Sequence, residues 1–284
     1  MKARITAAVI LAFVSALTVP FARAQGALDR TKVLRAAAEA LGMVRWSDIG
    51  GANTRLPGID IVNTMEFQAS GTSDLNGRAV KTDVHVALGY NPAAMRVEIT
   101  RTPDGGAAQH SIQTVRETWA WDESQIGAGL VPGKGTATPV NASVQERLLN
   151  LWALPYGVIK AAYAAGDKAT IATEGGATVI TTPLSGLLAG VTVKATLDAK
   201  NLITKVETRS DNPARANLAT ETEYSNFADH AEVLTDVKTP GHIVRKQGGR
   251  TVFDLQVKTW ETNDPYLVFP VPASVKTAAA ANSR

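Results

Sequence analysis

The sequence predicts an α+β protein in which a single large, curved antiparallel β-sheet forms a half-open barrel that is wrapped around or closed by helices. Most of the 284-residue chain consists of short segments rich in Val, Ile, Thr and aromatic residues, separated by Gly, Pro, Asn and Asp. The order along the chain is helix, strands, helix pair, strands. Because helices do not alternate with strands, a parallel sheet is excluded, and the helices are expected to fill the concave face of the sheet.

The first 24 residues are typical of a secretory signal peptide. A basic start with Lys2 and Arg4 precedes an apolar run over residues 5–19, and a small-x-small pattern ends at Ala24. The run is shorter than the ~20 apolar residues that span a bilayer. We therefore expect cleavage near Ala24 and a periplasmic or secreted protein without a stable membrane anchor.

The charge of the chain argues against a nucleic-acid partner. The sequence has 29 Lys and Arg against 26 Asp and Glu, and the excess lies in the signal peptide, at Lys2, Arg4 and Arg23. Removing that segment leaves a formally neutral chain whose basic residues are scattered singly, whereas nucleic-acid binding needs them clustered. The absence of cysteine also excludes disulfides, thiolate metal sites and cysteine nucleophiles.

A first helix is predicted over residues 27–41, since Leu34, Ala37 and Leu41 recur at helical spacing and Gly42 follows as a cap. After it the apolar period changes to two, which is typical of strands. The first run of predicted strands covers residues 59–71, 79–90, 95–101 and 111–121.

Turns and a loop separate these strands from the next helices. Asn76-Gly77 and Asp104-Gly105 are typical of tight hairpin turns, because both positions accept positive φ values. Residues 127–139 contain so much Gly and Pro that they predict a loop.

The second helical stretch spans residues 142–165. Pro155 and Gly157 interrupt it, so we expect two helices or one kinked helix. A second run of strands completes a single domain over residues 25–276, and the alanine-rich residues 277–284 are expected to form a disordered tail. These later strands are predicted at residues 177–182, 191–197, 203–210, 218–227, 242–245 and 252–262.

The helix pair carries more apolar residues than the covering of a sheet requires. They form either a solid core or, together with nearby tryptophans, the lining of a cavity for an acyl chain or another apolar ligand. The candidate ligand-binding residues are Trp119, Trp121, Leu148, Leu151, Trp152, Tyr156, Ile159, Tyr163 and Trp260.

Catalytic and metal-binding patterns are absent from the sequence. The four histidines form no H-x-H or H-E-x-x-H pair, and no G-x-S-x-G turn occurs. Glu221 and Glu223 alternate on a predicted strand, and Asp229, His230 and Glu232 form a short polar cluster, but both patterns are more typical of a solvated surface. We therefore expect no catalytic residue, no metal and no cofactor.

Residues 151–162, LWALPYGVIKAA, resemble a segment in the N-terminal accessory region of some exported metallo-β-lactamase-fold hydrolases. Weaker similarities are Trp121-Asp122 and residues 270–275, and Tyr156 stands where that segment is expected to have histidine. The zinc-binding H-x-H-x-D-H domain would follow Val275 and does not, so the resemblance implies the accessory domain without hydrolase activity. The order of elements also resembles the LolA/LolB lipoprotein-carrier fold, a half-open β-barrel closed by helices.

These observations favour a non-catalytic exported module that binds a hydrophobic or lipid-like ligand between sheet and helices. One alternative is a protein-interaction domain that docks on a separately encoded hydrolase. The remaining alternative, a hydrolase, depends only on Glu221, Glu223, Asp229, His230 and His242. The expected partners are an apolar small molecule or a partner protein.

Overall fold

The computed structural model describes residues 28–44, 46–49, 52–55, 62–229 and 236–282. The predicted signal peptide, His230 and Glu232 lie outside these residues.

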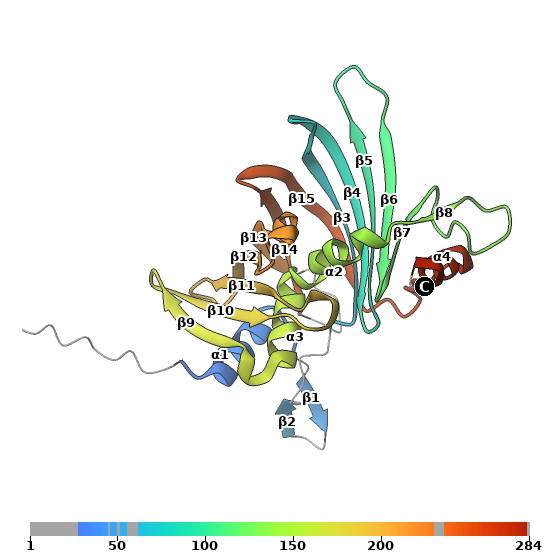
Figure 1. Ribbon diagram of the computed structural model, residues 1–284. Coiled ribbons are helices and arrows are strands. Elements are labelled where there is room, and N and C mark those ends of the chain that lie inside the picture. The colour runs from blue at the N-terminus through green and yellow to red at the C-terminus, as the bar shows by residue number, and fades with distance from the viewer. Residues whose placement is uncertain (1–27, 45, 50–51, 56–61, 230–235, 283–284) are drawn as a thin grey trace, which may run out of the picture.

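A single antiparallel sheet of 13 strands forms the body of the protein (Figure 1). Its strand order is β8-β7-β6-β5-β4-β3-β15-β14-β13-β12-β11-β10-β9, and β8 and β9 form its two open edges. The pairing of β3 with β15 joins the two halves of the chain. The predicted curved, unclosed antiparallel sheet is therefore confirmed. Its strands are β3 (Thr64–Leu75), β4 (Arg78–Tyr90), β5 (Ala93–Thr102), β6 (Gln109–Arg116), β7 (Trp119–Glu123), β8 (Ala137–Pro139), β9 (Thr170–Glu174), β10 (Ala177–Pro183), β11 (Val191–Leu197), β12 (Ile203–Ser210), β13 (Thr220–Asp229), β14 (Lys238–Gln247) and β15 (Arg250–Thr262).

The structure differs from the predicted strands in three places. The segment predicted as one strand over residues 111–121 is divided between β6 and β7, because Glu117 adopts a positive φ of 50° and turns the chain. The edge strands β8 and β9 were not predicted. A small separate hairpin of β1 (Trp46–Ile49) and β2 (Ala52–Arg55) was not predicted either.

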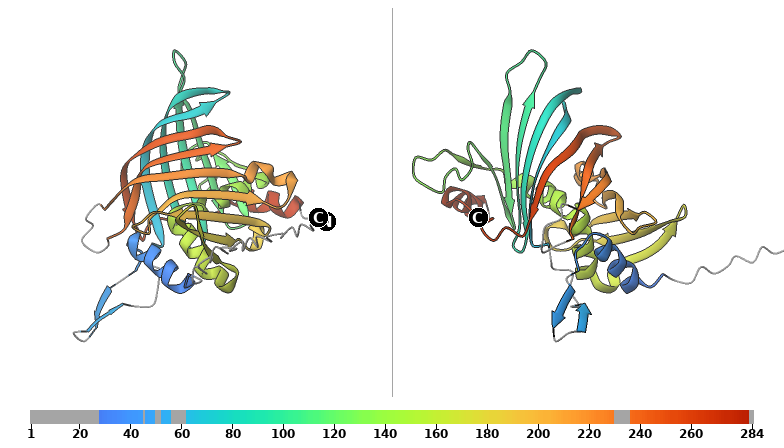
Figure 2. Two further views of the ribbon diagram at one scale, coloured as in Figure 1. Left: turned by 90° about the vertical axis from the view of Figure 1, so that its left-hand side faces the viewer. Right: turned by 180° about the vertical axis from the view of Figure 1, so that it is seen from behind.

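The helices lie mainly on the concave face, as the two views in Figure 2 show. At the predicted interruption the chain forms two helices, α2 and α3. They pack so closely at Gly157 that an added Cβ atom would lie 2.6 Å from the carbonyl oxygen of Leu151. A glycine is therefore required where the two helices meet. The helices are α1 (Arg30–Ala40), α2 (Val144–Trp152), α3 (Pro155–Ala165) and α4 (Ala273–Asn282), with short 3-10 helices at Asn141–Ser143, Gly166–Lys168, Gly186–Leu188 and Pro213–Leu218.

Buried polar contacts fix α2 to the sheet. The side chain of Arg147 on α2 donates from one terminal nitrogen to the carbonyl oxygens of Thr114 (3.0 Å) and Trp121 (2.8 Å). Its other terminal nitrogen contacts Asp122 Oδ1 at 2.6 Å. At the end of α2, the hydroxyl of Tyr224 donates to the carbonyl oxygen of Ala153 at 2.9 Å. The helix is thereby held over β6, β7 and β13 by bonds at both of its ends.

The C-terminal residues differ from the expected disordered tail. Helix α4 runs from Ala273 to Asn282 and lies beside β7 and β8 (Figure 1). The prediction relied on the absence of an apolar face, but one residue, Val275, is fully buried and alanine has the highest helix propensity of all residues. Among the described residues, no helix is long and apolar enough to span a membrane.

Candidate functional site

A cavity of about 300 Å³ lies between α2 and the inner face of the sheet. Strands β3 to β6 extend well beyond α2, so the helix covers only part of the concave face (Figure 1). The strands bring apolar side chains into this cavity because every second residue points inward. Examples from five strands are Phe67, Val86, Met95, Ile99, Ile243 and Leu255.

The arginines of the lining lie toward one end of the cavity, whereas the polar Gln113 is paired with Val97 beside the apolar lining. Strands β5 and β14 are separated by three strands of an antiparallel sheet, so they run in the same direction. Along β5 the inward residues change from Met95 at the start to Arg101 near the end. Along β14 they change from Ile243 through Arg245 to Gln247. The cavity therefore has an apolar end and a basic end.

Arg101 is held in place at the basic end by two contacts. Its guanidinium lies over the ring of Phe253, 5.8 Å from the ring centroid. Its Nε donates a hydrogen bond of 2.9 Å to Ser73 Oγ, which in turn contacts Thr82 Oγ1 at 2.7 Å. Burial lowers the pKa of Arg101, because a low-dielectric environment disfavours the charged form. Arginine nevertheless remains positively charged in proteins.

Arg245 lies directly opposite Phe253 on the neighbouring strand. Its Nε is buried and has no hydrogen-bond partner. Burial lowers the pKa of Arg245, while the nearby Tyr224 and Glu146 raise it. No ion pair of Arg245 is found within the described part of the chain. The two arginines are therefore both neighbours of Phe253, one over its ring and one as its strand partner, and the buried Nε of Arg245 has no protein partner.

A second cavity, of about 310 Å³, lies between α3 and the end of β10. Trp152, Leu184 and Leu188 line it together with alanines of α3 and Lys168. The ring of Trp152 also lies 5.7 Å from the ring of Tyr90.

The nine residues predicted to bind a ligand occupy three kinds of position. Trp152 lines the second cavity, and Trp119, Tyr163 and Trp260 are only partly buried. None of the nine lines the first cavity. Their assignment to a ligand stays a prediction. The remaining five, each at most 5% exposed, are Trp121, Leu148, Leu151, Tyr156 and Ile159.

The residues of the first cavity were missed because the prediction concentrated on apolar residues of the helix pair and on tryptophans, whereas most of the lining comes from other strand residues. Alternation along β5 identifies the inward face, which includes Val97 and Ile99, but it does not show how much of that face a helix covers. The signal in the sequence was a basic residue in an inward position of a predicted strand, at Arg101.

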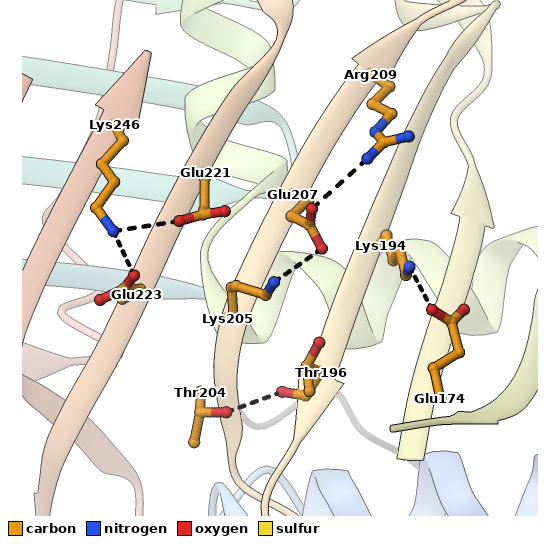
Figure 3. Close-up of polar contacts among 10 residues, drawn as sticks. All are labelled: Glu174, Lys194, Thr196, Thr204, Lys205, Glu207, Arg209, Glu221, Glu223 and Lys246. Carbon is orange, nitrogen blue, oxygen red and sulfur yellow. Dashed lines mark hydrogen bonds and ion pairs between the residues drawn. The ribbon is translucent and has the colours of Figure 1, made fainter. Parts of the chain in front are cut away.

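The two glutamates on β13 share one lysine partner (Figure 3). Lys246 Nζ lies 3.3 Å from Glu221 Oε1 and 2.6 Å from Glu223 Oε1. The hydrogen bond from Lys246 lowers the pKa of Glu223, whereas a general acid needs a raised pKa. Neighbouring strands carry similar pairs on the same outer face, such as Lys205 with Glu207.

Two histidines also form carboxylate contacts on the outer face. His242 Nε2 lies 2.7 Å from Asp254 Oδ1, and its Nδ1 lies 3.5 Å from Ser225 Oγ. His85 contacts Glu66 and, at 3.1 Å, Glu98. Across the residues that the structure describes, no group of three or more acidic or histidine side chains is arranged to hold a metal ion.

Comparisons with known proteins give structural similarity only. No protein-family model matches the chain, and no curated protein matches it significantly. Similar solved structures include a LolA superfamily protein from Nitrosomonas europaea, with 10% identity over 86% of this chain and 99% of that one. A putative outer membrane lipoprotein-sorting protein domain from Vibrio parahaemolyticus has 10% identity over 83% and 94%. A DUF1329 family protein from Desulfovibrio piger has 7% identity over 88% and 98%, and the TM-score is 0.46 in all three cases.

Proposed function

We propose that the protein is a non-catalytic, exported binding module that holds a hydrophobic, lipid-like ligand in the cavity between the curved sheet and α2. The observation that carries this proposal is the cavity of about 300 Å³ with apolar walls on β3, β4, β5, β14 and β15. Binding sites for small molecules are concave, mostly apolar and supplied with a few polar groups, and the cavity has these properties.

The attachment of α2 supports a lasting cavity. Collapse of the cavity would require α2 to move toward the inner face of the sheet, and Arg147 opposes that movement through its bonds to Thr114, Trp121 and Asp122. Because Arg147, Thr114 and Trp121 are buried, breaking the bonds between them without replacement would cost free energy. These bonds fix the position of α2 relative to β6 and β7 and so support a preformed cavity.

The proposed location outside the cytoplasm follows from the predicted signal peptide over residues 1–24. A binding module with an uncovered apolar concavity suits the transfer of a poorly soluble molecule through an aqueous compartment. We therefore place the function in the periplasm or outside the cell.

The test is ligand retention combined with a variant that fills the cavity. Protein purified from the periplasm is analysed by native mass spectrometry and titrated with a fluorescent fatty acid. Val97→Trp places an indole in the cavity and is expected to abolish uptake. Thr100→Trp, on the outer face of the same strand, is the matched control and should bind normally. A protein that is always empty and takes up no probe would contradict the proposal.

A second candidate function, a protein-interaction module, is favoured by one surface loop. Between β7 and β8 the side chains of Ile126, Leu130 and Val131 are 45%, 41% and 57% exposed. Exposed apolar groups that lie together mark contact surfaces. A photo-crosslinker at Val131 should then capture the same hydrolase repeatedly, while one at Lys200, in an exposed turn, should not.

A further inference from the structure

We propose that the cavity selects anionic amphiphiles with a single chain, whose acid group is bound by Arg101 and Arg245 while the chain lies along the apolar end. This inference rests on the proposed function, because it names the class of ligand that the same cavity takes.

The separation of polar from apolar lining gives the orientation of the ligand. The basic end lies where β5 and β14 finish, at Arg101 and Gln247. The opposite end is lined by Met95, Val86 and Phe67. A purely apolar molecule would leave the arginines unused, and a fully polar molecule would leave the apolar walls in contact with water. An amphiphile matches both ends at once.

The geometry of the two arginines suits an acid group. Phe253 neighbours both, since the guanidinium of Arg101 lies over its ring and its backbone is paired with that of Arg245. A guanidinium offers several donors in a planar fork that matches carboxylate and phosphate oxygens. The buried Nε of Arg245 has no acceptor in the protein, and a buried donor without a partner is costly. An anionic oxygen placed here would satisfy that donor.

One acidic residue opposes the two arginines. Glu146 on α2 lines the cavity and lies close enough to Arg245 to affect its charge. It is exposed to solvent, however, and no ion pair between Glu146 and Arg245 is formed in the described structure. The charged residues of the lining, Arg101, Arg245 and Glu146, thus carry a net charge of +1 and still favour an anion.

The size of the cavity favours one chain over two. Its volume of about 300 Å³ lies at the lower end of the range of about 300–1,000 Å³ that small-molecule sites occupy. The shared chemistry of the ligand is then an acid group on a single apolar chain. The acid is either the carboxylate of a fatty acid or the phosphate of a single-chain phospholipid.

The experiment compares three probes of equal chain length: dodecanoate, dodecyl phosphate and dodecanol. Each probe displaces a fluorescent reporter from the full-length protein at concentrations below micelle formation. We expect at least one of the two acids to bind at least about tenfold more tightly than the alcohol, since hydrogen bonds to charged groups are among the strong ones. The acid that binds more tightly identifies carboxylate or phosphate as the head group.

Variants then assign the preference to the arginines. Arg245→Gln and Arg101→Gln should each reduce acid binding by at least about tenfold and leave dodecanol binding unchanged. Arg209→Gln, whose side chain is 77% exposed on the outer face, is the matched control and should retain the preference. The comparison of acid with alcohol in the unaltered protein needs no variant, so it stands even where a variant fails to fold.

Each outcome has one meaning. If no probe binds, both the proposed function and this inference are wrong. If the alcohol binds as tightly as both acids, the apolar cavity remains and the anion site is wrong. If the acids are preferred but folded Arg245→Gln and Arg101→Gln keep that preference, the assignment to the two arginines is wrong.

Discussion

The guanidinium of Arg101 lies over the ring of Phe253, 5.8 Å from its centroid. The strand partner of Phe253 is Arg245, so a single aromatic residue neighbours both cations at the basic end of the cavity. Like charges repel when they are brought together, and the face of a phenyl ring carries negative charge that offsets part of this repulsion. Among the residues that the structure describes, neither arginine forms an ion pair, so the arrangement keeps two cations close to an apolar cavity.

Replacing the aromatic ring should weaken acid binding. Phe253→Leu keeps an apolar side chain but removes the cation–π contact, which is worth about 0.5–1 kcal/mol at partly exposed sites. We expect affinity for dodecanoate to fall about two- to fivefold, with dodecanol binding nearly unchanged. The control is Phe269→Leu, which removes a similar contact, 5.9 Å from Arg96, outside the cavity lining. Equal losses in both variants would contradict the role of Phe253.

Neutralising the acidic residue of the lining should strengthen acid binding. Glu146→Gln removes a negative charge near Arg245, and an exposed charge interaction of this kind is worth up to about 1 kcal/mol. We expect affinity for dodecanoate to rise about two- to fivefold, measured by reporter displacement at low salt. Glu174→Gln, on the outer edge strand β9, should have no effect. An unchanged or weaker affinity in Glu146→Gln would contradict the prediction that Glu146 opposes acid binding.

Removing the buried arginine of α2 should destabilise the protein. Arg147→Met keeps an unbranched side chain but leaves the carbonyl oxygens of Thr114 and Trp121 without their donor. We expect the free energy of unfolding to fall by about 2–4 kcal/mol in urea denaturation. Arg209→Met, on the exposed outer face, should change it by no more than about 0.5 kcal/mol. A loss below about 1 kcal/mol in Arg147→Met would show that other contacts hold α2.

The ion-paired outer face gives a prediction about pH. Lys246 lowers the pKa of Glu223 by donating a hydrogen bond to it, and the same bond raises the pKa of Lys246. The stabilisation from Glu223 is therefore present above its unfolded pKa of about 4.3 and is lost as the pH falls through the folded value. The stabilisation from Lys246 is present below its unfolded pKa of about 10.4 and is lost as the pH rises through the folded value.

We expect Lys246→Gln to raise the pKa of Glu223 toward its ordinary value in an NMR titration of the carboxyl groups. The difference in unfolding free energy between this variant and the unaltered protein should be largest near neutral pH. Lys200→Gln, in the turn between β11 and β12, is the control and should leave the titration of Glu223 unchanged. A Glu223 pKa that is the same with and without Lys246 would contradict the pairing.

Most of the sheet could be predicted from local signals. Asn76-Gly77 was expected to be a tight turn, and both residues have positive φ values, 54° and 85°, between β3 and β4. The helix interruption at Pro155 and Gly157 was equally visible, because one residue lacks a backbone donor and the other lacks a side chain.

The edge strands, the turn between β6 and β7, and the cavity depend on tertiary contacts that local sequence patterns do not show. Strand β9 is largely exposed and β8 has three residues, so neither has an alternating pattern to detect. The turn between β6 and β7 is made by Glu117 without a glycine. The cavity could not be predicted, because the alternation around Ile99 shows which face is inward but not where α2 ends. Arg245 follows Val244 and precedes Lys246, which by sequence alone is typical of a surface strand.

The most direct test of the proposed cavity is a methyl NMR titration of the unaltered protein with dodecanoate. The account predicts changes in the methyl chemical shifts of Val97, Ile99 and Leu255, which line the cavity between α2 and the sheet. It predicts no change for Val131 in the exposed loop. Changes confined to Leu184 and Leu188 would place the ligand in the second cavity and contradict the account. The absence of any change at a concentration that saturates known fatty-acid-binding proteins would contradict it equally.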